Sequence, residues 1–158
     1  MTALVWYEWF KAFHVIAAVL WVGGAFMLTV LAILTLREKD PVRLVGFTRQ
    51  VAFLGERFFP LLSLTLLALG FAMIENGYIP WTYDMTWVQI GIAGWVFSFI
   101  VGVFYLAPRS SKLKKLLETR GPEDAEVQDV IHRLLWAARV DNAVLLFVVF
   151  DMAAKPWS

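Results

Sequence analysis

The side chains best suited to chemistry in this chain are a few polar groups that lie in very apolar surroundings. His14 is the first of them, in the stretch YEWFKAFHVIAAVLWVGG, where every residue after Lys11 other than the histidine is apolar or small. An imidazole in hydrocarbon costs free energy unless it has a hydrogen-bonding partner or a ligand. Because a neutral imidazole also binds transition metals and haem iron through a ring nitrogen, His14 is a candidate metal or cofactor ligand.

Each of the other three apolar segments carries one polar side chain at a depth similar to that of His14; these are Glu75, Gln89 and Asp151. A rise of about 1.5 Å per helical residue places the four groups in one layer, which is a candidate site. The alternative is that Glu75 and Asp151 reach interfacial water and that His14 is a packing residue with a satisfied hydrogen bond. The sequence leaves both interpretations open.

One face of the first apolar segment combines aromatic and small side chains. It consists of His14, Ala17, Ala18, Trp21, Gly24 and Ala25, which recur at helical spacing. Small faces allow helices to approach closely in lipid, and they also leave room for a flat ligand beside a histidine. Trp21 is therefore a second candidate cofactor-binding residue.

A second polar group is expected in the inner half of the membrane. Arg57 opens the second apolar segment, and Asp141 and Asn142 lie in the inner half of the last one. An isolated aspartate at this depth is costly, so we expect Arg57 to be its partner. We interpret the set as a structural clamp between helices.

Methionine and a second histidine are further possible metal ligands. Met73, Met85 and Met152 lie near the outer end, and a histidine with thioethers is a soft ligand set suited to Cu(I), although methionine is also an ordinary filler of membrane helices. At about 1.5 Å of rise per residue, His132 falls near the opposite membrane face from His14. This excludes a haem held by both histidines of one subunit, and we expect His132 to be exposed.

The elements that must position these residues follow from composition. The chain has 158 residues, of which 60% are hydrophobic and 17% charged, so much of its apolar surface must face lipid. Its continuous apolar runs are long enough to span a bilayer as helices and lack the alternation of a membrane barrel. We predict an all-α integral membrane four-helix bundle, a single domain over residues 1–158, with helices over 12–36, 58–74, 87–107 and 134–154.

Charge distribution predicts the orientation of this bundle. Apart from Lys11 and Lys155, every lysine and arginine lies in the first and third connections or in their flanks. The positive-inside rule therefore places both termini on the extracytoplasmic side. The predicted outer interface also carries a belt of tryptophans: Trp6, Trp9, Trp81, Trp87 and Trp157. Between the third and fourth helices, SSKLKKLLETRG predicts a short amphipathic helix on the inner leaflet.

Several classes of function are excluded or disfavoured. The chain has no cysteine, so a disulfide, a thiolate metal site and a cysteine nucleophile are impossible. It contains no zinc-protease motif, phosphate-binding loop or nucleophile elbow, so any redox chemistry requires a bound cofactor. Anionic lipid headgroups explain its basic inner stretch more simply than nucleic acid does. No cleavable signal peptide is expected.

The residues around His14 closely resemble the first helix of the HemJ family of four-helix bacterial membrane proteins, and also CopD-like relatives. The similarity continues in ERFFPLLSLTLLALG, WVQIGIAG and VDNAVLLFVVFDMAAKP. The resemblance implies haem b binding through His14 and a link to protoporphyrinogen oxidation. However, Gly91 stands where the family has a functional lysine, so the oxidase reaction is not carried over. A haem at His14 would need another axial ligand or an open position, and Gln89 and Met85 are nearest in sequence.

Three functions are compatible with these residues. The first is a multi-pass membrane protein that binds haem b through His14 and acts in redox or haem-related chemistry. The second is a structural or assembly subunit of a membrane complex, and the third is a copper-binding or copper-transport protein in which His14 is a ligand. Whether the chain is an enzyme is left open. The expected location is the bacterial inner membrane, and the expected partners are the bilayer and a second copy or another membrane subunit, without nucleic acid.

Overall fold

The computed structural model describes residues 2–38 and 40–156, so the predicted belt residue Trp157 lies outside the described residues. The described chain is almost entirely helical and shows no strand, which confirms the all-α class. Its elements are α1 (Thr2–Glu38), α2 (Pro41–Phe53), η1 (Leu54–Phe58), α3 (Phe59–Glu75), α4 (Thr86–Ile100), η2 (Val101–Leu106), α5 (Ala107–Arg120) and α6 (Ala125–Ala154).

The two π-helical segments η1 and η2 join shorter pieces into long helices, and a proline explains each of them. Pro60 and Pro108 have no N–H to donate to the carbonyl four residues earlier, so the regular ladder cannot continue there. The backbone widens instead. Phe59 N–H bonds to the Leu54 carbonyl, and Ala107 N–H bonds to the Gly102 carbonyl, each across one extra residue. The described residues therefore form four continuous helices rather than eight separate ones.

Three of these continuous helices are long and apolar enough to cross a membrane: Leu4–Glu38, Pro41–Glu75 and Thr86–Arg120. The prediction of four such helices is supported for three, because α6 does not qualify among the described residues. The apolar part of α6 contains Arg139, Asp141 and Asp151, which lower its hydropathy. Each predicted segment lies within a longer helix, since apolar runs mark only the part of a helix that suits lipid.

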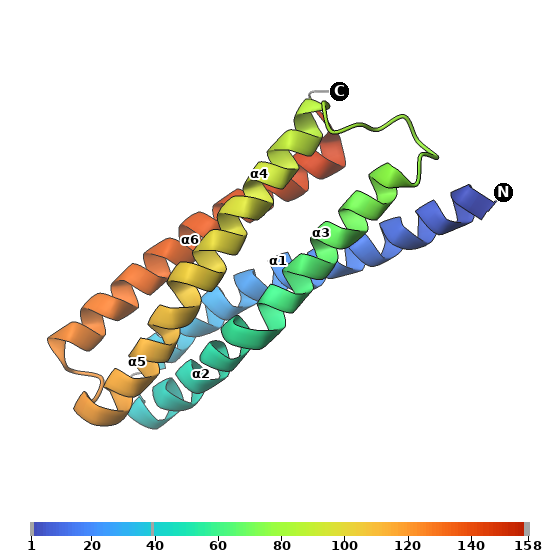
Figure 1. Ribbon diagram of the computed structural model, residues 1–158. Coiled ribbons are helices and arrows are strands. Elements are labelled where there is room, and N and C mark those ends of the chain that lie inside the picture. Colours follow the sequence, from blue (N-terminus) through green and yellow to red (C-terminus); the bar gives the residue numbers. More distant parts are fainter. Residues whose placement is uncertain (1, 39, 157–158) are drawn as a thin grey trace.

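The segment predicted as a separate surface helix is instead α5, which continues directly from α4 (Figure 1). Leu113 and Leu117 of α5 are buried in one cluster with Leu44 of α2 and with Val127 and Ile131 of α6. The apolar side of α5 thus packs on protein. The sequence could show that this side is apolar, but the neighbouring helices determine what covers it.

The helices form an elongated bundle in which α1 packs against α3 and α6, and α4 packs against α6. Both termini lie at the same end as the connection between α3 and α4 (Figure 1). We call this the terminal end. The opposite end, formed by α2, α5 and the start of α6, is called the basic end after its basic residues Arg43, Arg49, Lys112, Lys115 and Arg120. Many large apolar side chains point out of the bundle, as expected of a surface that faces lipid.

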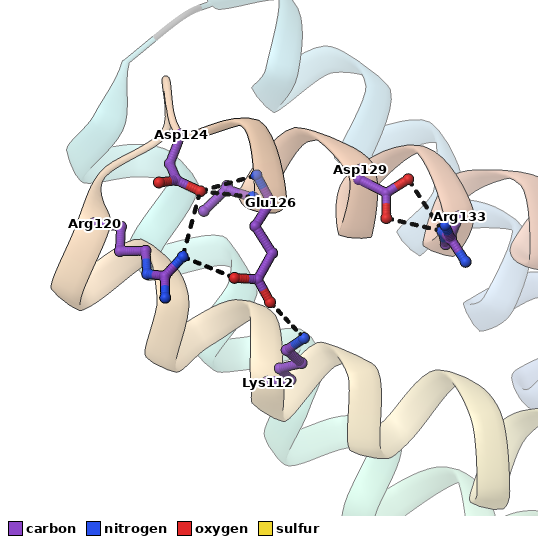
Figure 2. Close-up of polar contacts among 7 residues, drawn as sticks. Lys112, Arg120, Asp124, Glu126, Asp129 and Arg133 are labelled. Carbon is purple, nitrogen blue, oxygen red and sulfur yellow. Dashed lines mark hydrogen bonds and ion pairs between the residues drawn. The ribbon is translucent and has the colours of Figure 1, made fainter.

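Ion pairs close the basic end between α5 and α6 (Figure 2). Glu126 accepts from Lys112 at 2.7 Å and from Arg120 at 2.8 Å, and Asp124 caps α6 by accepting from the backbone N–H groups of Glu126 and Val127. Gly121 ends α5 with φ 81°, a conformation that favours glycine. These exposed pairs contribute little energy individually, but they fix the turn that returns the chain into the bundle.

Candidate functional site

A cavity of about 630 Å³ lies at the terminal end, between α1, α3, α4 and α6. Its walls are mostly apolar and include four tryptophans: Trp21, Trp81, Trp87 and Trp95. Its charged or titratable lining residues include Lys11, His14 and Lys155. The volume lies within the range typical of small-molecule and cofactor sites, and so does the combination of apolar walls with a few polar groups.

The structure positions His14 in this cavity through a contact between α1 and α3. Its Nδ1 lies 3.0 Å from the main-chain oxygen of Leu66. A carbonyl oxygen only accepts hydrogen bonds, so Nδ1 carries the proton and Nε2 is left with a free lone pair. Gly70, one turn further along α3, makes room for the ring, because a Cβ there would lie 3.3 Å from His14 Cε1.

Trp21 lies further along the same helix and is 7% exposed. It packs in a cluster with Ala17, Leu66 and Leu145 and forms part of the cavity wall. The predicted pairing of His14 with Trp21 on one face of α1 is therefore seen in the structure. Trp95 extends this wall from α4, and its indole N–H donates to the Ser63 carbonyl at 2.9 Å.

Two lysines reach the cavity from its terminal end. Lys155 Nζ lies 3.6 Å from the centre of the Trp81 ring and 4.8 Å from that of Trp87. Burial and the nearby Lys11 ammonium both lower the pKa of Lys155. Lys11 also pairs with Glu8 at 2.6 Å. From the sequence, these two lysines indicated only the orientation of the chain in the membrane. Their separation from the other basic residues was the feature of the sequence that could have indicated their place at this cavity.

Methionine occupies the space beside Gly91. A Cβ at Gly91 would lie 1.8 Å from Met152 Cε, so Met152 fills the place that a side chain on α4 would take. Met73 lines the same cavity from α3, whereas Met85 lies at the start of α4 and is not among the lining residues. Two of the three outer methionines therefore share the cavity with His14.

The other members of the predicted polar layer do not join His14. Gln89 is exposed and does not line the cavity, so the structure does not bring it together with His14, and its assignment as a cofactor-binding residue stays a prediction. Its neighbours Val88 and Gly91 face the bundle, which directs Gln89 outward. Glu75 is exposed and accepts a 2.6 Å hydrogen bond from Tyr83, which raises the pKa of that tyrosine. Asp151 is fully buried but does not line the cavity.

The predicted pairing of Arg57 with Asp141 is wrong. Arg57 lies in η1, is exposed, and places its guanidinium 5.9 Å from the centre of the Phe53 ring. Asp141 is buried and lies beside Ser98 of α4. Asn142 donates to Thr29 Oγ1 at 2.9 Å and thereby joins α6 to α1. The π-helical turn at η1 turns Arg57 away from the bundle, and sequence spacing alone could not indicate that.

His132 is exposed on α6, as predicted. Over residues 2–38 and 40–156, no group of three His, Asp or Glu side chains is arranged to hold a metal ion. A metal at His14 would accordingly need thioether ligands, a cofactor or another chain to complete its coordination.

A protein-family model described as a predicted integral membrane protein (DUF2269) matches residues 8–156. The chain belongs to this family. The match runs from the first turns of α1 to just beyond Lys155, so it includes every element that forms the terminal cavity of this DUF2269 protein. No curated protein and no solved structure matches the chain.

Proposed function

We propose that this membrane protein binds haem b in the cavity at its terminal end, where His14 would hold the iron. One observation carries the proposal: the Leu66 carbonyl holds Nδ1 of an imidazole that borders a large apolar cavity. Histidines that bind metals usually donate their other ring N–H in this way, because the bond fixes the ring and leaves Nε2 as the ligand. A histidine that served only in helix packing would not require a cavity beside its ring.

The remaining lining residues fit an amphipathic cofactor that carries acidic groups. The apolar wall around Trp21 would exclude water from a macrocycle, and Lys11 and Lys155 would pair with its two carboxylates. Burial lowers the pKa of Lys155 and the nearby Lys11 ammonium lowers it further, so a carboxylate beside the two lysines would stabilise both ammonium groups. A haem supplies electron transfer or oxygen chemistry according to its axial ligands and the polarity around it.

Position 91 distinguishes this chain from the HemJ-like pattern that it resembles. Gly91 offers no ligand where that pattern has lysine, and Met152 occupies the adjoining space. A thioether that held the iron together with His14 would raise the reduction potential of a haem, which would favour electron transfer. We therefore propose an electron-transfer or haem-handling role, without protoporphyrinogen oxidation.

We further propose that the terminal end faces the extracytoplasmic side of a bacterial inner membrane. The concentration of lysine and arginine at the basic end supports this orientation through the positive-inside rule. The proposed haem would then lie toward the outer leaflet. The exposed apolar surface would be covered by lipid, with room for a second copy or another membrane subunit.

Copper binding is the second candidate, and one observation favours it. His14, Met73 and Met152 line the same cavity, and together they offer the nitrogen and thioether ligands that suit Cu(I). A structural or assembly subunit is the third candidate. It requires no ligand at His14, so the same variants distinguish it from the other two.

The decisive experiment is an absorbance spectrum of the full-length protein purified from cells supplied with ample haem. We expect a Soret band that His14→Ala abolishes and that the matched variant His132→Ala retains, because His132 is exposed far from the cavity. A wild-type protein that folds but shows no Soret band refutes haem binding. Cu(I) titration of the wild type and of a Met73→Leu/Met152→Leu variant then tests the copper candidate, and equal affinities would reject it.

A further inference from the structure

A second cavity, of about 190 Å³, lies in the basic half of the bundle. Its lining surface is mostly apolar, like that of the first, but it includes hydroxyl and carboxyl or amide side chains, which are Thr29, Thr48, Ser63, Ser98, Ser110, Asp141 and Asn142. Trp21 lines both cavities. The proposed haem site does not include this second cavity.

Asp141 is the residue of this cavity whose chemistry is unexplained. It is 7% exposed, and the Ser98 hydroxyl lies beside its carboxyl group. Neither Asp141 Oδ1 nor Ser98 Oγ makes a hydrogen bond of good geometry with another described residue. Asn142 does not satisfy the carboxyl group, since its amide donates to Thr29, which in turn donates to the Ala25 carbonyl.

Among the described residues that line the cavity, Asp141 is the only one that is charged or titratable. The elements around it contribute hydroxyls: Thr29 from α1, Thr48 from α2, Ser63 from α3, Ser98 from α4 and Ser110 from α5. Two arginines could be expected near Asp141, but neither lines this cavity. Arg57 lies over the Phe53 ring, and Arg139 is exposed on α6. A buried carboxylate without a cation beside it is costly, and uptake of a proton removes that cost.

The cavity extends from Asp141 to the elements of the basic end. Thr48 and Ser110 line it on α2 and α5, the elements of the basic end, and Ser98 lines it beside Asp141. Gly55 of η1 and Gly102 of η2 border the same space. Both π-helical turns thus adjoin the cavity, and such turns are common at functional sites because they disturb the regular backbone hydrogen bonds.

We infer that Asp141 is a proton-binding site that exchanges protons with water at the basic end through this cavity. In the exchange, a carboxylate oxygen of Asp141 takes a proton from a hydronium ion that enters through the cavity and leaves water; the reverse step returns the proton to water. The site does not depend on haem at His14.

The test is infrared spectroscopy of the full-length protein in lipid nanodiscs at mildly acidic, neutral and alkaline pH. We expect the carbonyl band of a protonated carboxylic acid, which grows as the pH falls and which exchange into heavy water shifts. Asp141→Asn should abolish this band. Asp151→Asn is the matched control, because it removes the other buried carboxyl group of α6 and should leave the Asp141 band in place.

A wild-type spectrum without a protonated-acid band, or a band that persists unchanged in Asp141→Asn, overturns the inference. Asp141→Glu provides a second variant in case the asparagine protein does not fold, and it should keep the band at a shifted position. Loss of the band on adding sodium or potassium at constant pH would identify a cation site instead and would also overturn it. Because none of these readouts involves a Soret band, the outcome is independent of the haem proposal.

Discussion

The ring nitrogen Nδ1 of His14 lies 3.0 Å from the main-chain oxygen of Leu66, so a helix backbone fixes the only imidazole among the described residues that line the terminal cavity. The carbonyl belongs to α3, which packs along α1. The orientation of the ring consequently depends on how closely these two helices approach. Gly70 provides the space for that approach, because its missing Cβ would meet the ring.

Gly70→Val should displace the imidazole and weaken ligand binding at His14. A Cβ at position 70 would lie 3.3 Å from His14 Cε1, and the two γ carbons of valine would add further bulk. Overpacking of this kind typically costs about 1–3 kcal/mol. We expect a shifted or lost Soret band and a lower thermal unfolding temperature. Gly46→Val is the matched control, since Gly46 lies in α2, away from this cavity, and a Cβ placed there would have no neighbouring atom within 4 Å. Equal spectra for both variants would contradict the assigned role of Gly70.

Gly91→Ala should stabilise the protein less than a glycine-to-alanine change at an open helical position, although alanine favours helices. Its Cβ would lie 1.8 Å from Met152 Cε, so the flexible end of the methionine must turn toward the cavity, which offsets part of the gain from helix propensity. Gly46→Ala in α2 meets no neighbour and should stabilise by about 0.5–1 kcal/mol through helix propensity. Thermal unfolding in detergent measures both changes. A second change, Met152→Ala, should relieve the clash, and failure to do so would show that Met152 is not its cause.

The lowered pKa of Lys155 predicts a pH dependence of stability. The folded protein disfavours the protonated ammonium, so Lys155 reduces the free energy of unfolding below its folded pKa, and this loss is recovered as pH rises through that pKa toward the unfolded value. Lys11→Gln removes one cause of the shift and should raise the pKa of Lys155. An NMR titration of the Lys155 side chain measures this. Lys115→Gln at the basic end should change nothing, and an unchanged pKa in Lys11→Gln would refute the coupling.

The separation of Arg57 from Asp141 can be tested with a double-mutant cycle. Because Arg57 lies over Phe53 rather than beside the carboxyl group, Arg57→Gln and Asp141→Asn should have additive effects on the free energy of unfolding, within about 0.5 kcal/mol. Ser98→Ala and Asp141→Asn should couple more strongly, since these two side chains adjoin. Chemical unfolding in mixed micelles gives the four free energies of each cycle. Strong coupling between Arg57 and Asp141 would contradict this separation and would support the predicted clamp between the two residues.

The sequence predicted the helical class well because the need to satisfy backbone hydrogen bonds in lipid leaves few alternatives for long apolar runs. It also indicated His14 and Trp21 correctly as neighbours on one face, since residues on a single helix have fixed relative positions. It placed His132 correctly for the same reason. Each of these predictions concerns one helix at a time.

Predictions that required the rotation of one helix relative to another were less successful. Gln89 has the expected height but faces outward, and Arg57 turns away from Asp141 at a π-helical turn that Pro60 induces. The sequence showed that one face of α5 is apolar, but it did not show which helices pack on that face. Hydropathy and depth are properties of residues along an axis, whereas a shared cavity depends on the angle of every helix about its axis.

The amino-acid sequence by itself therefore determined a helical membrane protein with few polar groups in its spans, because composition and length are sufficient for that conclusion. Only the tertiary structure decided that Lys11, His14, Met152 and Lys155 line one cavity and that Asp141 lines another beside hydroxyl groups. The physical reason is that packing between helices, including the close contacts at Gly70 and Gly91, sets which faces meet.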